Sequence, residues 1–161
     1  MALVDYFLKI DGIEGESGDS KHKGEIELES FSYGGTQAIS RAGGGSGAGK
    51  VMLQDFHFTM KNNKASPKLF LHCCNGAHIK MATLVARKAG KDQQEFLKIT
   101  MSDCLISSYQ QGGSGHADII PTDQVAINFS KVEMEYKEQK ADGSLAGAVK
   151  SGWDLKANKA V

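Results

Sequence analysis

Alternation of apolar and polar residues dominates this chain and predicts a mainly β fold. In the first strand the apolar residues of one side are Val4, Tyr6, Leu8 and Ile10. Such period-two alternation is typical of a strand with one buried face. The same pattern predicts strands at residues 25–29, 51–60, 79–87, 95–101, 104–109, 124–136 and 151–156. Within 124–136 the apolar residues stand at odd positions up to Phe129 and at even positions after it, so the apolar face of the strand changes. This change predicts a bulge or a strand shared between two sheets.

One segment has helical spacing instead. Ser66 is a candidate N-cap, Pro67 suits the first helical position, and Leu69 and Phe70 begin an apolar face. Gly76 suits the left-handed residue that ends a helix, so we expect a helix of about ten residues here. Short strands with glycine-rich turns and one helix predict a β-barrel or sandwich with the helix outside it. No repeat and no linker divides the chain, so residues 1–161 form one predicted domain.

Composition narrows the possible partners. The 161 residues contain 19 basic and 19 acidic side chains, so the net charge is zero. This balance gives no support for nucleic-acid binding and permits self-association. No apolar run is long enough for a membrane span, and the first ten residues lack the features of a secretory signal. We therefore expect synthesis in the cytosol and, if the protein is exported, a route without a cleaved signal peptide.

Cysteine and histidine give no pattern of a reactive or metal site. Cys73, Cys74 and Cys104 are odd in number, two of them are adjacent, and their spacing with His72 and His78 matches no usual zinc pattern. No nucleophile and base can be paired by spacing among the five histidines. We assign no catalytic residue, no metal site and no cofactor, and we expect that the protein is not an enzyme.

The glycine-rich segment 43–50 (GGGSGAGK) is the main alternative. It satisfies G-x-x-x-x-G-K, but Val51 replaces the Ser or Thr whose hydroxyl would hold magnesium. A phosphate-binding loop follows a buried strand and opens a helix, whereas residues 36–41 are polar and residues 51–60 have strand periodicity. We favour a loop between two strands. The rival hypothesis is a monomeric nucleotide-binding protein or enzyme that uses Gly43–Lys50.

Several ordered segments together resemble one known family. They are residues 7–17 (FLKIDGIEGES), 31–34 (FSYG), 47–51 (GAGKV) with 54–56 (QDF), 66–69 (SPKL), 125–129 (VAINF) and 136–143 (YKEQKADG). This set, which spans nearly the whole chain, resembles the haemolysin-coregulated proteins, Hcp, the tube proteins of bacterial type VI secretion systems.

The resemblance implies a fold and an assembly. The implied fold is a small β-barrel of two sheets with one helix packed outside. Six copies would form a ring, and rings would stack into a tube inside a contractile sheath, behind a spike protein and with effector proteins in the lumen. The implied partners are thus the chain itself, the spike, the sheath and effectors.

The resemblance also points to candidate contact residues. The connection that would contact a neighbouring subunit or the next ring comprises Ser40, Arg41, Gly43, Gly44, Gly45, Ser46, Gly47, Ala48, Gly49 and Lys50; the alternative is a solvated connection without contacts. Ser32, opposite two aromatic neighbours, is a candidate for lumen and effector contact, or a strand residue without a special role. Glu25, Glu27 and Glu29 are expected on one solvated strand face, where they are possible inter-subunit charges.

Overall fold

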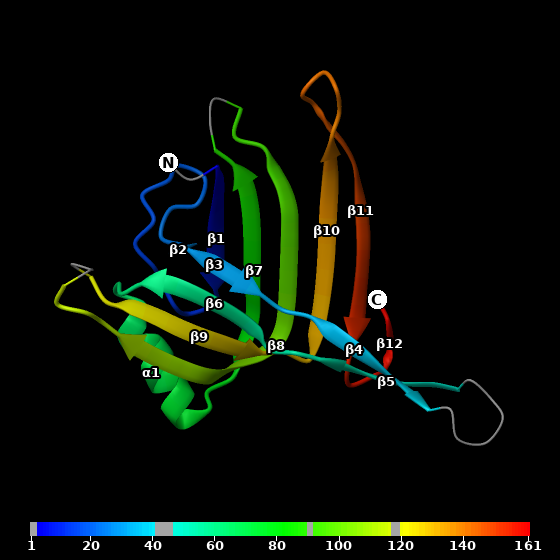
Figure 1. Cartoon of the computed structure of the whole chain (residues 1–161), viewed down its shortest axis with the longest axis horizontal. Helices are drawn as coiled ribbons and strands as arrows, with labels where there is room; N and C mark the ends of the chain where they lie inside the picture. Colours follow the sequence, from blue (N-terminus) through cyan, green and yellow to red (C-terminus); the bar gives the residue numbers. More distant parts are fainter. Residues whose placement is uncertain (1–2, 41–46, 90–91, 117–119) are drawn as a thin grey trace.

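The computed structural model describes residues 3–40, 47–89, 92–116 and 120–161. In this part of the chain the strands are β1 (Val4–Ile10), β2 (Ile26–Leu28), β3 (Ser30–Ser32), β4 (Gly35–Ser40), β5 (Gly47–Leu53), β6 (Phe56–Lys61), β7 (Ile79–Lys88), β8 (Glu95–Gly112), β9 (Thr122–Asn128), β10 (Lys131–Gln139), β11 (Leu145–Asp154) and β12 (Lys159–Ala160). The helix α1 (Ser66–Asn75) lies between β6 and β7. Figure 1 shows two crossing sheets, with α1 at one end and the β4–β5 hairpin projecting from the body.

The two main sheets share one long strand. The first, sheet A, has the order β12-β11-β10-β8-β7-β1-β2, and the second, sheet B, has the order β3-β6-β9-β8. The predicted strands 95–101 and 104–109 are therefore one continuous strand, β8. It leaves one sheet and enters the other near Asp103, whose φ is 52°. This left-handed conformation bends the chain at the crossing point.

The predicted run 124–136 is instead two strands. β9 belongs to sheet B and β10 to sheet A, and the chain passes between sheets at Phe129 and Ser130. The change of apolar parity thus marks a change of sheet between two strands. The mainly β fold with one helix is confirmed, whereas the two sheets do not close into a barrel in the described part of the chain.

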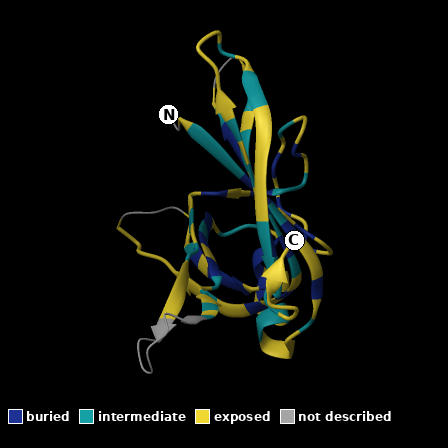
Figure 2. Cartoon of the chain, turned by 90° about the vertical axis from the view of Figure 1, so that its right-hand side faces the viewer, coloured by how far each residue is buried: buried dark blue, intermediate teal, exposed yellow. Residues whose placement is uncertain are grey.

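The core fills the space between the sheets. Sheet B contributes Phe56 and Phe58, and sheet A contributes Leu8, Leu84 and Ile99, all almost completely buried. Burying such side chains contributes about 1.5–3 kcal/mol each. Figure 2 shows the buried residues concentrated where the sheets cross, while the far end of sheet A is exposed or half-buried.

The helix closes one side of this core through Leu69, which is fully buried. Ala65 and not Ser66 is the N-cap residue, and it makes no side-chain capping bond. The Ser66 hydroxyl instead donates a hydrogen bond to the buried Asp123 carboxylate at 2.5 Å, which ties the helix to β9. Gly76 ends the helix with a φ of 63°. This is the left-handed conformation that the sequence predicts for the residue after a helix.

Candidate functional site

The outward face of sheet B forms a shallow depression of about 350 Å³. Strand register places Ser30, Thr59, Gln124 and Gln110 in one cross-strand row and Ser32, His57, Ala126 and Ser108 in the next. The cross-strand row between these two has its side chains on the opposite, core side of the sheet; it consists of Phe31, Phe58, Val125 and Tyr109. We call the outward side chains of these strands the sheet B face.

Ser32 lies in this face as the sequence predicts. It is exposed at the end of β3, directly opposite His57 of β6. Its neighbour Phe31 packs inward, stacked on Phe56 at 5.7 Å between ring centroids and edge-on to Tyr6 at 5.2 Å. The inward aromatic side chains thus fix the outward direction of Ser32.

The chemistry of the sheet B face is hydrogen bonding without net charge. Hydroxyls and carboxamides line the depression, and His57 is its only ionisable side chain among the described residues. Such a surface donates and accepts hydrogen bonds but has no paired acid and base for proton transfer. It suits contact with another molecule better than catalysis.

The segment that imitates a phosphate-binding loop lies in a β-hairpin. β4 and β5 pair with each other as a separate two-stranded sheet, with Thr36 opposite Met52 and Gln37 opposite Val51. Gly47, Ala48, Gly49 and Lys50 belong to β5. A strand therefore follows where a nucleotide-binding loop requires a helix.

This hairpin holds only part of the predicted contact connection. A Cβ at Gly49 would collide with the carbonyl oxygen of Ala38 on the paired strand, so glycine is required there for close approach of the two strands. Ser40 ends β4. The predicted contact residues between Arg41 and Ser46 lie outside the described residues.

A second exposed surface continues the core side of sheet A beyond the cover of sheet B. Here Met134 lies opposite Ile99, and Tyr136 lies opposite both Leu97 and Val149. Met134, Tyr136 and Val149 are 41%, 48% and 72% exposed, although strand parity places them on the core side. We call these three side chains the β10–β11 apolar strip. Exposed apolar side chains that are grouped in this way mark contact surfaces.

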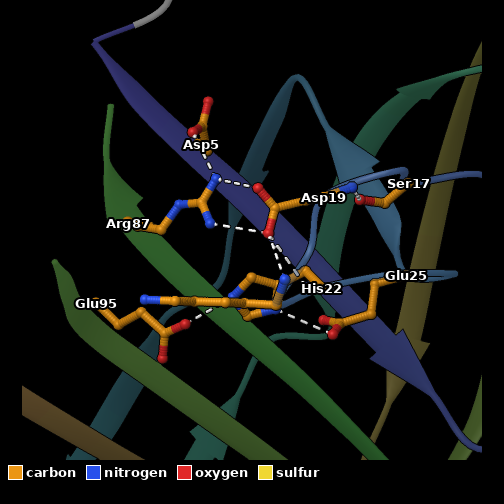
Figure 3. Close-up of polar contacts among 8 residues, drawn as sticks. Asp5, Ser17, Asp19, His22, Glu25, Arg87 and Glu95 are labelled. Atoms are coloured by element: carbon orange, nitrogen blue, oxygen red, sulfur yellow. Dashed lines mark hydrogen bonds and ion pairs between the residues drawn. The ribbon is translucent and has the colours of Figure 1, made fainter. Parts of the chain in front are cut away.

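A buried ionic anchor joins the segment 11–25 to sheet A (Figure 3). The Arg87 guanidinium donates hydrogen bonds to both carboxylate oxygens of Asp19, at 3.0 and 2.7 Å, and to Asp5 at 3.2 Å. The Arg87 Cζ atom also lies 4.8 Å from the centroid of the Phe7 ring. These hydrogen bonds hold the pKa of Asp19 well below its usual range, and the same carboxylate raises the pKa of Arg87.

His22 completes this attachment. Its ring is stacked on Phe7 at 4.4 Å, and its Nδ1 and Nε2 contact Glu25 at 3.0 Å and Glu95 at 2.6 Å. Glu25 is therefore half-buried and paired within the chain, contrary to the expected solvated face. Glu27 is exposed on β2 as expected, and Glu29 lies 4.0 Å from Lys61 of the same chain.

The three cysteines are in different environments. Cys104 is buried, Cys73 is half-buried and Cys74 is exposed, and all are free thiols. Burial, with the nearby Asp103 charge, raises the pKa of Cys104 to about 12. No group of histidine, cysteine and carboxylate side chains that suits a metal ion occurs among the described residues. Likewise, none of the helices described is long and apolar enough to cross a membrane.

The sequence analysis missed the ionic anchor. Asp5 and Arg87 are direct cross-strand partners, but 82 positions separate them in sequence. The available signal was an arginine that follows three apolar residues, Leu84 to Ala86, in a buried strand. A buried guanidinium requires a carboxylate partner, although the sequence does not say which one.

Comparison with known proteins agrees with this architecture. The family described as "Type VI secretion system effector, Hcp" matches residues 7–136. "Protein hcp1" of Pseudomonas aeruginosa is 44% identical over 158 residues, which cover 96% of this chain and 97% of that protein. The crystal structure of Hcp1 from Salmonella typhimurium has a TM-score of 0.84 at 39% identity and covers 99% of this chain and 100% of that one.

A further solved structure, described as a type six secretion system protein, has a TM-score of 0.92 at 28% identity and covers 98% of this chain and 99% of that one. These likenesses define the class of the molecule as a structural protein of type VI secretion. The chain belongs to the Hcp family. Members of this family are secreted tube proteins and not enzymes, so the nucleotide-dependent alternative is set aside.

Proposed function

We propose that this chain assembles into six-membered rings that stack into the secretion tube and carry effector proteins in the lumen. The observation that carries the proposal is the β4–β5 hairpin, whose strands pair only with each other in the described chain. Its base is held by Leu53, which packs against the core, while Met52 is 68% exposed. A hairpin attached at one end offers its remaining surface to a neighbouring subunit or ring.

The β10–β11 apolar strip is the second proposed contact. Burial of Met134, Tyr136 and Val149 against the next subunit would remove apolar surface from water and favour association. In the described part of the chain most of β11 also lies at the free edge of sheet A, because β12 pairs there only with Trp153 and Asp154. Ring closure covers such edges, which otherwise promote uncontrolled pairing.

Native mass spectrometry at several protein concentrations, under reducing conditions, tests assembly. The wild type should show a six-subunit species. Val149→Glu should reduce that species, because it places a charge in the apolar strip. The adjacent Ala148→Glu is a matched control on the opposite face of the same strand. A monomeric wild type, or equal loss in both variants, contradicts the proposed interface.

The sheet B face is the proposed lumen surface, with Ser32 as an effector contact. Its uncharged hydrogen-bonding groups suit many weak contacts, which a confined lumen strengthens by raising the effective concentration. Ser32→Gln should lower the amount of effector recovered with the rings and leave the six-subunit species intact. Unchanged recovery with an intact ring removes Ser32 from the effector surface.

Two further parts of the assembly proposal concern charge and location. Glu27, and to a lesser degree Glu29 with its Lys61 contact, are proposed to face lysines of a neighbouring subunit. Glu27→Lys should then lower ring stability more at low than at high salt.

We also propose that the chain accumulates in the cytosol and leaves with the tube, together with the spike and effectors, inside the sheath. Fractionation of cells with and without a contractile sheath measures this directly.

A further inference from the structure

A depression of about 580 Å³ lies between the end of β1, the segment 11–25 and the first turns of α1. Four lysines from these three segments line it: Lys9, Lys21, Lys23 and Lys68. We call it the lysine depression. It belongs to neither the sheet B face nor the hairpin nor the apolar strip, and the proposed assembly leaves it without a role.

The charges around the lysine depression do not cancel. None of its four lysines has an ion-pair partner within the described residues. Of its three carboxylates, Glu25 contacts His22 at 3.0 Å and Glu14 lies 3.7 Å from Lys64, which is outside the depression. Asp11 has no ion-pair partner among the described side chains, and the four lysines outnumber the three carboxylates. The site therefore has a surplus of positive charge, although the whole chain is neutral.

The segment that presents Lys21 and Lys23 is held in place before any ligand arrives. Asp19 is fixed by Arg87, and its Oδ1 also accepts the backbone N–H of Lys21 at 2.9 Å. His22, between the two lysines in sequence, is buried and attached to β8 through Glu95. Because the buried histidine faces inward, the lysines on either side of it are exposed. Such pre-organisation reduces the ordering cost of binding.

We propose that the lysine depression binds a small, multiply charged anion whose charges are carried by phosphate groups. Lysine ammonium groups bind phosphate as point charges, and a compound with several phosphate groups offers negative charge to all four lysines of the depression at once. Its volume falls in the range of small-molecule sites, about 300–1,000 Å³. The remaining carboxylate, Asp11, opposes the ligand and limits its affinity.

Calorimetric titration with tripolyphosphate at low ionic strength tests the proposal. The wild type should bind with a dissociation constant of about 1 mM or lower. The combined variant Lys9→Gln, Lys21→Gln, Lys23→Gln and Lys68→Gln should bind at least about tenfold more weakly. The matched control carries the same change of charge at Lys80→Gln, Lys98→Gln, Lys140→Gln and Lys159→Gln, which are exposed and outside the depression. It should stay within about threefold of the wild type.

Asp11→Asn gives an independent test in the opposite direction, because removal of the opposing carboxylate should tighten tripolyphosphate binding. A second arm uses phosphatidylcholine vesicles with and without phosphatidylglycerol. Binding to tripolyphosphate identifies a free phosphate compound as the ligand, and binding only to the phosphatidylglycerol vesicles identifies a lipid headgroup. Loss of binding in the combined variant supports the site in both cases.

Three results overturn the proposal. The first is no binding of either phosphate source. The second is equal weakening in the combined variant and its control, which reports only the overall charge. The third is binding of poly-glutamate without binding of phosphate, which assigns the depression to an acidic protein segment. Ring formation is measured separately, so failure here leaves the proposed tube function untouched.

Discussion

The strongest test of the fold compares two leucines of the same helix. Leu69 is 0% exposed and Leu71 is 56% exposed, so the change to alanine is chemically identical and differs in burial. Leu69→Ala removes apolar surface from the core and leaves a cavity beneath α1. This change should lower the free energy of unfolding by about 3–4 kcal/mol. At about 2–4 °C per kcal/mol for a chain of this size, Tm should fall by roughly 6–16 °C.

Leu71→Ala should change the free energy of unfolding by less than about 0.5 kcal/mol, because its side chain is already largely in water. Urea unfolding followed by circular dichroism measures both values. All samples need the same protein concentration and assembly state, since oligomerisation adds to apparent stability. Equal destabilisation by the two variants, or a change below about 1 kcal/mol for Leu69→Ala, refutes the inferred burial of the helix.

Three further outcomes are expected. Gly15→Ala should destabilise the fold, because a Cβ at this position would lie 2.5 Å from a backbone carbonyl oxygen. Gly18→Ala should not, because a Cβ there meets nothing within 4 Å. Thermal denaturation of the two variants measures the difference. The lowered pKa of Asp19 contributes stability that is present above the unfolded-state pKa, near pH 4, and is lost as pH falls through the folded-state value. Asp19→Asn should therefore be less stable than the wild type in urea at pH 7, and this difference should shrink below about pH 4. With N-ethylmaleimide at pH 8, the native protein should be labelled first at Cys74 by peptide mapping, whereas Cys104, buried and with a pKa of about 12, should react only after unfolding.

Local sequence pattern predicted the elements whose two faces differ. Ile26 and Leu28 alternate with carboxylates, and both are buried as expected. The helix was also predictable, because Pro67 and Gly76 mark its ends. Its N-cap was wrong by one residue, since Ser66 bonds to Asp123, far away in sequence, instead of to the helix backbone.

Elements that depend on partners distant in sequence were less predictable. In β4, Thr36 and Gln37 point to opposite sides and are both polar and exposed, so alternation does not reveal this strand. The continuity of β8 across Asp103 depends on its change of sheet, which no local pattern encodes. The sequence placed Ser32 opposite its aromatic neighbours, but the remaining residues of the sheet B face come together only through strand pairing.

The shared strand β8 has a mechanical consequence for the proposed tube. It runs unbroken from Glu95 to Gly112, and its hydrogen bonds join it to β7 and β10 in one sheet and to β9 in the other. A force along either half of this strand acts in shear on many hydrogen bonds at once, instead of opening them one after another. Because β8 belongs to both sheets, its hydrogen bonds resist displacement of one sheet relative to the other under an applied force.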